Sequence, residues 1–462
     1  MRINPILLTD SYKASHWLQY PPGTTGMYDY MESRGGRFGS TIFFGLQYLL
    51  KEYLTIPITD ADVLEAKEFF DEHGEPFNAE GFGQIVANGG HWPVRIKAVP
   101  EGLEVPTRNI VLSLESTGGP NTFWSASWLE NQIVRDWYPS TVATNSYYCK
   151  RAILEHLLET ANDPWSEIYF KLHDFGSRGV SSHESAGIGG MAHLVNFRGT
   201  DTIEGVMFAR DYYGERMAGY SIPAAEHSSI TSWTKEREIL AYKNMIRRFL
   251  KKDKTVACVS DSYDIFNVID NMWCGELHEE IKTSGGCLVI RPDSGDPPSM
   301  VLRCLQHLED RAGMTKNMRG YKILPPYFKL IQGDGINHDS LRDILTTMTQ
   351  HKYSTSNIAF GMGGGLLQQL DRDTQKWALK CSEVTMDTGE IVPVFKDPVT
   401  DPGKVSKSGR LSLIFEGGEF KSVPAESTKA DILETVYEDG KILRNQTFES
   451  VRKNSERNLS RV

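Results

Sequence analysis

The pattern of hydrophobic and polar positions changes twice along the chain of 462 residues. In the N-terminal third, apolar residues recur at helical spacing in some segments and at strand spacing in others. Residues 94–116 favour short strands broken by Pro and Gly, and Pro139 is expected to follow the end of a helix. The helices are expected at residues 41–55, 121–139 and 141–162.

A regular alternation begins near residue 165, where short apolar strands each end in a polar or glycine-rich turn and a helical pattern usually follows. Such an alternation predicts a parallel, barrel-like α/β array, whose active site lies at the carboxyl ends of the strands. Eight units of this kind occur, at residues 168–179, 193–202, 219–227, 255–264, 287–296, 327–337, 357–367 and 377–384.

These changes in pattern predict an α/β protein with three segments. Residues 1–160 are expected to form a mixed α+β domain, and residues 161–385 an irregular α/β barrel that carries the active site. After residue 385 the chain returns to short strands and turns. The C-terminal segment, residues 386–462, is therefore expected to pack on the N-terminal domain.

Composition and charge narrow the class of protein. The chain is 40% hydrophobic and 24% charged, which is typical of a globular protein with a large core. It has no apolar run of roughly 18 residues and no signal-peptide pattern, so we expect a cytoplasmic protein with no membrane partner. Six dispersed cysteines predict neither a disulfide framework nor a zinc ribbon. The net charge of −10 and the lack of a basic run argue against nucleic-acid binding.

Charged residues collect at the predicted strand ends. One such turn would be explained by the polarity of turns alone, but paired arginines and aspartates at successive ends favour an active site. The residues are His173, Asp174, Arg178, Asp201, His227, Asp261, Arg291, Asp293 and Asp334. Phe175 could stack on a planar ligand beside Arg178, although a core position would explain Phe175 equally well.

Two glycine-rich turns, QGDG (332–335) and GMGGG (361–365), each follow an apolar strand. Their exposed backbone N–H groups would suit a phosphate, with tight turns as the alternative. An acidic protein that binds an anion must gather cations locally. Such an excess occurs near the C-terminal part and fits a diphosphate, unless it is only a solvated face: Arg372, Lys380, Lys396, Lys404, Lys407 and Arg410.

The stretch SIPAAEHSSIT (221–231) places His227 among small residues, where it could be a metal ligand, a base, a nucleophile or a structural histidine. Histidine spacing gives no zinc site, because His173, His183 and His193 are ten residues apart and no H-E-x-x-H occurs. A metal would more readily be Mg²⁺ carried with substrate phosphates.

Long motifs resemble the nicotinamide phosphoribosyltransferase family, in order from about residue 5 to about residue 455. They are LLTDSYKASHWLQYPP, FKLHDFGSRGVSSHESAGIG, VNFRGTDT, SIPAAEHSSITSW, VSDSYDI, IRPDSGDP, IQGDG, IAFGMGGGLLQ and VFKDPVTDPGK. The resemblance implies the irregular barrel of type II phosphoribosyltransferases, with a mixed α+β domain. It also implies a homodimer with shared active sites that makes nicotinamide mononucleotide and diphosphate from nicotinamide and phosphoribosyl diphosphate.

The resemblance also implies roles for residues on the nicotinamide side. Phe175 would sandwich the nicotinamide ring with Tyr12 of the partner subunit, and Asp201 would accept a hydrogen bond from the carboxamide. Arg178 and Arg291 would complete this side of the site. The groups that would hold phosphate or diphosphate are Asp10, Arg34, Gly333, Asp334, Gly363, Gly364, Arg372, Lys380, Lys396 and Lys404.

For His227 the resemblance implies phosphorylation by the co-substrate ATP, with Glu226 and Asp261 as candidates to orient the imidazole. Asp293 would belong to the same catalytic group. Mg²⁺ would be bound through the substrate diphosphate, with Asp293 as a possible ligand.

Two departures and three alternatives accompany the resemblance. The loop at 32–45 looks short, which puts the role of Arg34 in question, and Ser177 stands where the family pattern has a tyrosine. Nicotinate phosphoribosyltransferase is a second reading, which a carboxylate at Asp201 disfavours because it repels nicotinate. A signalling protein without catalysis and a phosphate-binding isomerase or aldolase are further alternatives with less support.

Overall fold

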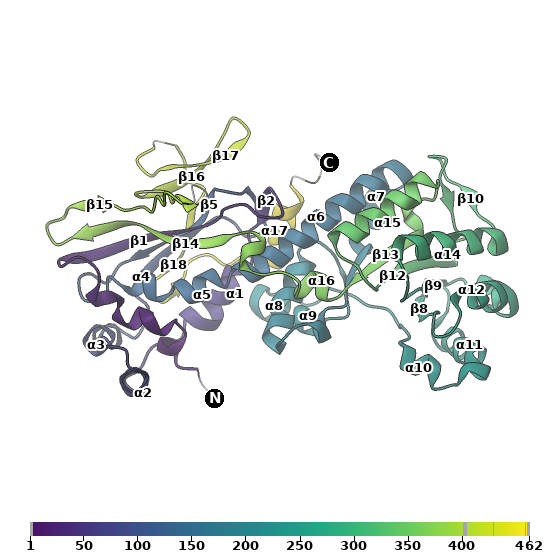
Figure 1. Ribbon diagram of the computed structural model, residues 1–462, viewed down its shortest axis with the longest axis horizontal. Coiled ribbons are helices and arrows are strands. Elements are labelled where there is room, and N and C mark those ends of the chain that lie inside the picture. Colours follow the sequence, from purple (N-terminus) through teal and green to yellow (C-terminus); the bar gives the residue numbers. More distant parts are fainter. Residues whose placement is uncertain (1–2, 401–403, 428, 458, 460–462) are drawn as a thin grey trace. The chain divides into compact units, whose positions relative to one another are not determined.

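The computed structural model describes residues 3–400, 404–427, 429–457 and 459 (Figure 1). The chain divides into two compact units, each with its own sheet. Unit 1 comprises residues up to Thr144 together with Asp211–Glu215 and Asp371–Arg457, and unit 2 comprises chiefly Asn145–Arg210 and Arg216–Leu370. Two of the divisions fall inside helices α6 (Trp137–Thr160) and α9 (Ile203–Tyr213), and another falls between Leu370 and Asp371. The boundaries near residues 160 and 385 stay a prediction of the sequence pattern.

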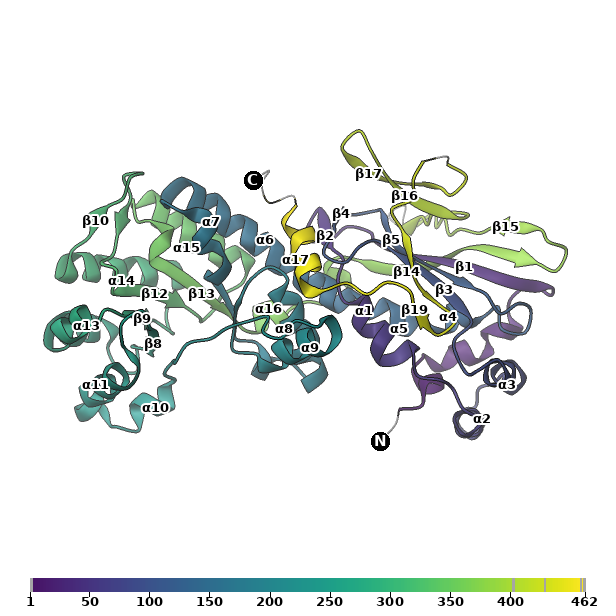
Figure 2. The ribbon, with the colours of Figure 1, turned by 180° about the vertical axis from the view of Figure 1, so that it is seen from behind.

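Unit 1 contains a seven-stranded antiparallel sheet, which Figure 2 shows from behind. Segments from both ends of the chain form it, because β1 pairs with β14 and β3 pairs with β18. In sheet order the strands are β15 (Ile391–Pro393), β14 (Trp377–Met386), β1 (Thr24–Ser33), β5 (Ile110–Ser116), β3 (Val94–Ala98), β18 (Glu434–Glu438) and β19 (Lys441–Ile442). Two short pairs accompany it, β2 (Ser40–Ile42) with β4 (Glu104–Pro106) and β16 (Leu411–Glu416) with β17 (Glu419–Pro424).

The helices of unit 1 are short, apart from α2. This helix begins at a capping box between Thr59 and Asp62, and it ends at Gly74, which has a positive φ of 90°. The helix predicted at 121–139 is broken in two, and Pro139 lies in the first turn of α6, where a missing N–H costs nothing. The helices are η1 (Pro5–Leu7), η2 (Ser11–Leu18), α1 (Leu46–Leu49), η3 (Leu50–Leu54), α2 (Asp60–His73), α3 (Ala79–Ala87), α4 (Ser125–Trp128), α5 (Glu130–Val134), η9 (Arg372–Thr374) and α17 (Phe448–Glu456).

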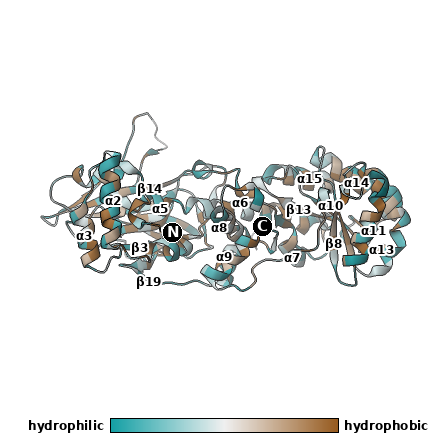
Figure 3. Ribbon diagram, turned by 90° about the horizontal axis from the view of Figure 1, so that it is seen from below, coloured by the Kyte–Doolittle hydropathy of each residue, from teal (hydrophilic) through white to brown (hydrophobic). Residues whose placement is uncertain are grey.

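Unit 2 contains a six-stranded parallel sheet. In sheet order its strands are β7 (Gly199–Thr200), β6 (Leu172–Asp174), β13 (Ile358–Met362), β12 (Phe328–Gln332), β9 (Cys287–Arg291) and β8 (Thr255–Val259). Helices cover the outside of the sheet, with α14 (Pro297–Ala312) and α15 (His338–Gln350) beside β12 and β13 in Figure 1. These helices are amphipathic, and α14 carries both hydrophobic and hydrophilic residues in Figure 3.

The remaining elements of unit 2 are mostly short. They are α7 (Pro164–Glu167), η4 (Ile168–Phe170), η5 (Ser177–Gly179), α8 (His183–Leu194), α10 (His227–Thr231), η6 (Lys235–Arg237), α11 (Glu238–Phe249), α12 (Ile265–Asn267), η7 (Val268–Glu276), α13 (His278–Ser284), β10 (Thr315–Lys316), β11 (Lys322–Ile323), η8 (Thr355–Asn357) and α16 (Gly364–Leu367). Among the helices of the described ranges, none is long and apolar enough to cross a membrane.

Residues 220–224 join the two edges of the parallel sheet. Tyr220 forms a parallel bridge with Gly199 beside β7, and Ala224 forms one with Ala257 of β8. The amide of Thr200 donates to the Tyr220 carbonyl at 3.0 Å, and the amide of Ala225 donates to the Ala257 carbonyl at 2.9 Å. The parallel sheet is therefore closed by this segment into an irregular barrel, which confirms the predicted fold class.

One predicted barrel strand belongs elsewhere. Residues 377–384 lie in β14, which pairs antiparallel with β1 in unit 1. The prediction of eight barrel units was wrong for this segment, because a run of apolar residues does not reveal which sheet will pair with it. Seven of the eight predicted units remain in the barrel.

Candidate functional site

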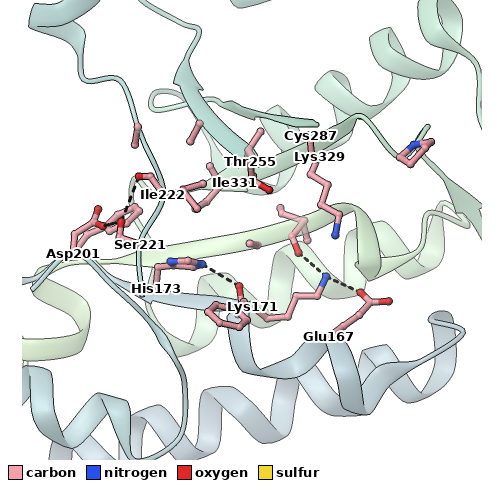
Figure 4. A pocket seen from close by; sticks show the side chains of 18 of the residues that line it. Glu167, Lys171, His173, Asp201, Ser221, Ile222, Thr255, Cys287, Lys329 and Ile331 are labelled. Atoms are coloured by element: carbon pink, nitrogen blue, oxygen red, sulfur yellow. Dashed lines mark hydrogen bonds and ion pairs between the residues drawn. The ribbon is translucent and has the colours of Figure 1, made fainter. Parts of the chain in front are cut away.

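The barrel interior holds a cavity of about 510 Å³. Small or aliphatic side chains, among them Ala257, Val289 and Ile331, line its middle and leave room that larger residues would fill. Figure 4 shows Asp201 and Ser221 at one end and Glu167, Lys171 and Lys329 toward the other. A cavity of this size is suited to a small planar ligand.

Phe175 lies at the carboxyl end of β6 and lines the cavity. Its amide donates to the Met362 carbonyl of β13 at 3.0 Å, which fixes the backbone next to the neighbouring strand. A Cβ at Gly361 would overlap the Phe175 ring, so glycine is needed there. The Arg291 guanidinium lies 5.9 Å from the ring centroid, within range of a cation–π contact.

Asp201 follows β7, and its amide donates to the Asp174 carbonyl at 2.9 Å. Ser221, in the segment that closes the barrel, donates its hydroxyl to the Asp201 carboxylate (Figure 4). His173 also lines the cavity; burial lowers its pKa, and its Nε2 donates to the Phe170 carbonyl at 3.1 Å. A neutral imidazole and an exposed carboxylate therefore share this end of the cavity.

The two predicted glycine turns lie against each other. A Cβ at Gly365 would lie 2.5 Å from the Ile336 carbonyl oxygen, so the GMGGG turn packs on the chain just after QGDG. Within QGDG, the Gln332 side chain donates to the Asp334 carbonyl at 3.1 Å, and Gly335 has a positive φ of 66°. Gly333 and Gly363 both border Phe175. Their backbone could hold a phosphate beside a stacked ring.

Arg178 lies on η5 and is exposed. The following residue, Gly179, lies against Gly364, so the loop that carries Arg178 borders the glycine turns. Ser177, the departure from the family pattern, donates its hydroxyl to the Glu204 carboxylate at 3.1 Å. Ser177 thus anchors the loop to α9.

His227 begins α10, and its side chain is 46% exposed. Its Nε2 lies 3.1 Å from Oδ1 of Asp261, whose side chain is only 5% exposed. The other nitrogen, Nδ1, lies 3.8 Å from Oδ2 of Asp293. Because a carboxylate accepts, Nε2 is the ring nitrogen that donates in the contact with Asp261, and Nδ1 is the nitrogen that does not take part in it.

Three acidic residues were expected around His227, and their contacts differ. Asp261 contacts the imidazole, whereas the Glu226 carboxylate accepts a hydrogen bond from Ser228. Asp293 forms a bidentate pair with Arg291, with N–O distances of 3.1 and 2.7 Å. The pair of Arg291 and Asp293 therefore lies between His227 and Phe175 and borders both.

No group of three His, Cys, Asp or Glu side chains within the described ranges could hold a metal ion. Both oxygens of Asp293, the possible Mg²⁺ ligand, are occupied by Arg291. The donor set therefore does not form a protein cage for a metal ion. It leaves a role for Mg²⁺ only as an ion held chiefly by substrate phosphates.

Several predicted diphosphate-binding cations lie in unit 1. Burial lowers the pKa of Lys380, and the positive charges of Arg34 and Arg372 lower it further, so these three cations influence one another. Lys396 and Lys404 are exposed and follow β15. Lys407 pairs with Glu32, and Arg410 bridges acidic residues of β5 and β14, so these last two cations support the fold.

Tyr12 also lies in unit 1, on η2, with 53% of its surface exposed. Its ring meets His16 edge-on at a centroid distance of 4.9 Å. Asp10 is the exposed residue before η2, and its carbonyl accepts from the Lys13 amide at 3.0 Å. Tyr12 and Phe175 thus belong to different units of the chain.

Sequence reasoning missed three residues that shape the site. They are Gly361, which makes room for Phe175, Ser221, which binds Asp201, and Ser294, which binds Asp261. Ser221 and Ser294 stand within motifs already singled out, but a serine in a turn gives no sign of the distant carboxylate that it will bind.

Comparisons with known proteins point to one family. The nicotinate phosphoribosyltransferase (NAPRTase) family model matches residues 170–445, and that of the nicotinamide phosphoribosyltransferase N-terminal domain matches residues 4–96. Nicotinamide phosphoribosyltransferase of Xanthomonas campestris pv. campestris is 52% identical over 97% of both chains. That of Acinetobacter baylyi is 29% identical over 98% of this chain and 97% of its own.

Two solved structures share the fold at 15% identity. Nicotinate-nucleotide pyrophosphorylase from Pyrococcus furiosus has a TM-score of 0.62 and covers 99% of this chain and 95% of its own. Human nicotinic acid phosphoribosyltransferase has a TM-score of 0.58 and covers 99% and 94%. These two structures show the fold. The sequence matches extend over nearly the whole length, and they show that the chain belongs to the nicotinate phosphoribosyltransferase family, among its nicotinamide phosphoribosyltransferases.

Proposed function

We propose that the chain transfers the phosphoribosyl group of 5-phosphoribosyl 1-diphosphate to nicotinamide, giving nicotinamide mononucleotide and diphosphate for NAD salvage. The observation that carries the proposal is the convergence of Phe175, Asp201, Arg291 and two glycine turns at one end of the barrel. As a member of its family the chain is a phosphoribosyltransferase, and the cavity determines which base it accepts.

Positioning dominates the nicotinamide side of the proposed reaction. The pyridine nitrogen attacks with a lone pair that needs no deprotonation, so the site needs no strong base. Phe175 would hold the ring in plane, and Asp201 would accept a hydrogen bond from the carboxamide N–H₂. Ser221 donates to Asp201 and so limits the directions in which Asp201 can turn. A carboxylate here repels nicotinate, which disfavours the nicotinate reaction.

On the donor side, the bond between ribose C1 and diphosphate breaks, and the leaving diphosphate gains negative charge. The glycine turns at Gly333 and Gly363 would hold the 5-phosphate. Following the family resemblance, Lys380 with its neighbouring arginines would hold the diphosphate across the subunit interface. Mg²⁺ bound to the substrate would supply further charge neutralisation. We place the reaction in the cytoplasm, which the six free cysteines support.

ATP coupling through His227 is a separate part of the proposal. Nδ1 of His227 would attack the γ-phosphorus of ATP, the bond to the β–γ bridging oxygen would break, and ADP would leave with the electron pair. The proton on Nε2 would stay hydrogen-bonded to Asp261, which stabilises the positive charge that the ring gains. Hydrolysis of the phosphohistidine would return the enzyme to its starting state.

The direct test incubates purified protein with phosphoribosyl diphosphate, Mg²⁺ and either nicotinamide or nicotinate, with and without ATP. Liquid chromatography then measures the mononucleotide of the base that was added. We expect product from nicotinamide in both conditions and faster formation with ATP. Absence of turnover in either condition would overturn the enzyme assignment, and equal efficiency with nicotinate would overturn the substrate assignment.

His227→Ala is expected to keep the slow reaction without ATP and to lose the stimulation by ATP, because the phosphoryl acceptor is gone. The ratio of the two rates measures this effect. His351→Ala is the matched control, since His351 is an exposed histidine whose ring nitrogen Nδ1 bonds to the Thr347 carbonyl of the preceding helical turn at 2.9 Å. Stimulation retained in His227→Ala would show that His227 has a structural role.

The proposal includes a homodimer in which Tyr12 of the partner subunit stacks on the ring held by Phe175. Its support is the large exposure of Tyr12 on η2, together with the family resemblance. Leu18 on the same helix is also strongly exposed, which is typical of a surface that a partner covers.

Mixing two inactive variants tests this arrangement. Tyr12→Ala and Phe175→Ala each impair every site in their own homodimers, but a mixed dimer contains one site with both aromatic residues. After subunit exchange at equal amounts, about a quarter of wild-type activity should return, because half of the dimers are mixed and each has one of two sites intact. No recovery, with exchange verified by differently tagged subunits, would contradict a shared site.

A further inference from the structure

Asp261 accepts two hydrogen bonds on the oxygen that does not face His227. The Ser294 hydroxyl donates to Oδ2 at 2.6 Å, and the Asp293 amide donates to the same atom at 3.0 Å. Oδ1 remains for Nε2 of His227. Both donors stand on the turn between β9 and α14, so this turn determines how the carboxylate faces the histidine.

We propose that Ser294 is a positioning residue for phosphoryl transfer, which fixes Asp261 and through it the tautomer and orientation of His227. The inference rests on the ATP coupling proposed above. A carboxylate that is free to rotate could offer either oxygen to either ring nitrogen. Two donors on Oδ2 remove that freedom and keep the proton on Nε2, which leaves Nδ1 ready to attack.

The turn that carries Ser294 is built to be rigid. Gly295 has a positive φ of 86°, and Asp296 caps α14 by accepting from the amide and hydroxyl of Ser299 at 3.1 and 2.5 Å. Asp293, the residue immediately before Ser294, pairs with Arg291 at the end of β9. The turn therefore connects the carboxylate behind His227 with the arginine beside Phe175.

Through this turn, substrate binding could affect the orientation of His227. A substrate phosphate that draws Arg291 toward itself would move Asp293, whose amide also holds Asp261. Substrate binding and the geometry of His227 would then be coupled through one turn of about four residues, with Ser294 as the fixed point on the histidine side.

The test compares Ser294→Ala with wild type by two measurements. The first is the rate at which acid-labile phosphoenzyme forms from γ-labelled ATP, which should fall about tenfold when one hydrogen bond to a carboxylate is lost. The second is the tautomer of His227 in ¹⁵N-histidine-labelled protein without ATP, assigned with His227→Gln. We expect a loss of the pure Nε2–H form in Ser294→Ala and its recovery in Ser294→Thr.

Controls separate this role from a general effect on the fold. Thr117→Ala removes a comparable hydroxyl–carboxylate bond, from Thr117 to Asp439 at 2.6 Å in unit 1, and should leave both measurements unchanged. In an Asp261→Asn background, Ser294→Ala should add little, because the two residues act on one step. An unchanged tautomer in Ser294→Ala would overturn the inference, as would full additivity with Asp261→Asn. Absence of phosphoenzyme in wild type would instead refute ATP coupling, and the tautomer would still decide the role of Ser294.

Discussion

At the scale of single residues, motifs identify the chemical groups of the site but not the partners that orient them. Phe175, Asp201 and His227 could be selected from the sequence because each follows an apolar strand within a long motif. The bond between Ser221 and Asp201 spans 20 residues and depends on how the barrel closes, so no local pattern predicts it. The same holds for Ser294 and Asp261, which are 33 residues apart.

Asp201→Ser is expected to lower kcat/KM for nicotinamide strongly, by roughly 10⁴-fold, because a site built to bond the amide loses its acceptor. The same change should also reduce the ratio of kcat/KM for nicotinamide to kcat/KM for nicotinate, because the negative charge that repels nicotinate is removed. Steady-state kinetics with both bases measure it, and Asp310→Ser on the exposed side of α14 is the control. An unchanged preference would mean that another group selects the base.

At the scale of elements, the sequence predicted the strand–turn–helix units well, but it did not reveal which of the two sheets each strand would join. Residues 357–367 and 377–384 have similar apolar patterns, yet the first forms β13 in the parallel barrel and the second forms β14 in the antiparallel sheet. Pairing depends on which edge is vacant in the folded chain, and that information is not local. Pro139 was misread for a similar reason, because proline is tolerated in the first turn of a helix as well as after its end.

Gly361 lies on β13, and the methyl group added by Gly361→Ala would occupy the space of the Phe175 ring. The substitution is therefore expected to weaken nicotinamide binding. Displacing the ring should raise KM for nicotinamide about tenfold or more, and overpacking should lower stability by about 1–3 kcal/mol. Gly83→Ala in α3 is the control, since nothing lies within 4 Å of its Cβ position. A normal KM in Gly361→Ala would show that the ring can shift without loss of function.

At the scale of the whole molecule, both units contain a buried carboxyl group with a raised pKa. Burial raises the pKa of Asp29 in β1 to about 7, and burial likewise raises that of Asp174 in β6 to about 7. In the unfolded chain both groups titrate near the ordinary aspartate pKa of 3.8. Between these values the native state binds more protons than the unfolded state, so each group's contribution to stability falls as pH rises toward 7.

Asp174→Asn should therefore gain stability relative to wild type as pH rises from 3.8 to about 7, and the difference should level off above that, since the amide does not ionise. Its Oδ1 can still accept from the Gly176 amide, the bond that Asp174 makes at 2.7 Å. Urea unfolding of both proteins across this range gives the difference in free energy. A difference independent of pH would mean that Asp174 ionises as easily in the native state as in the unfolded chain.

The closing segment of the barrel, residues 220–224, has a mechanical consequence. It is held at each edge by a single bridge, at Gly199 and at Ala257, so it is the weakest seam in the ring. Ser221 on this seam steadies Asp201, and the chain reaches His227 only six residues later. A ligand that hydrogen-bonds Asp201 would also restrain Ser221, and we expect it to reduce the motion of the short segment that leads to His227.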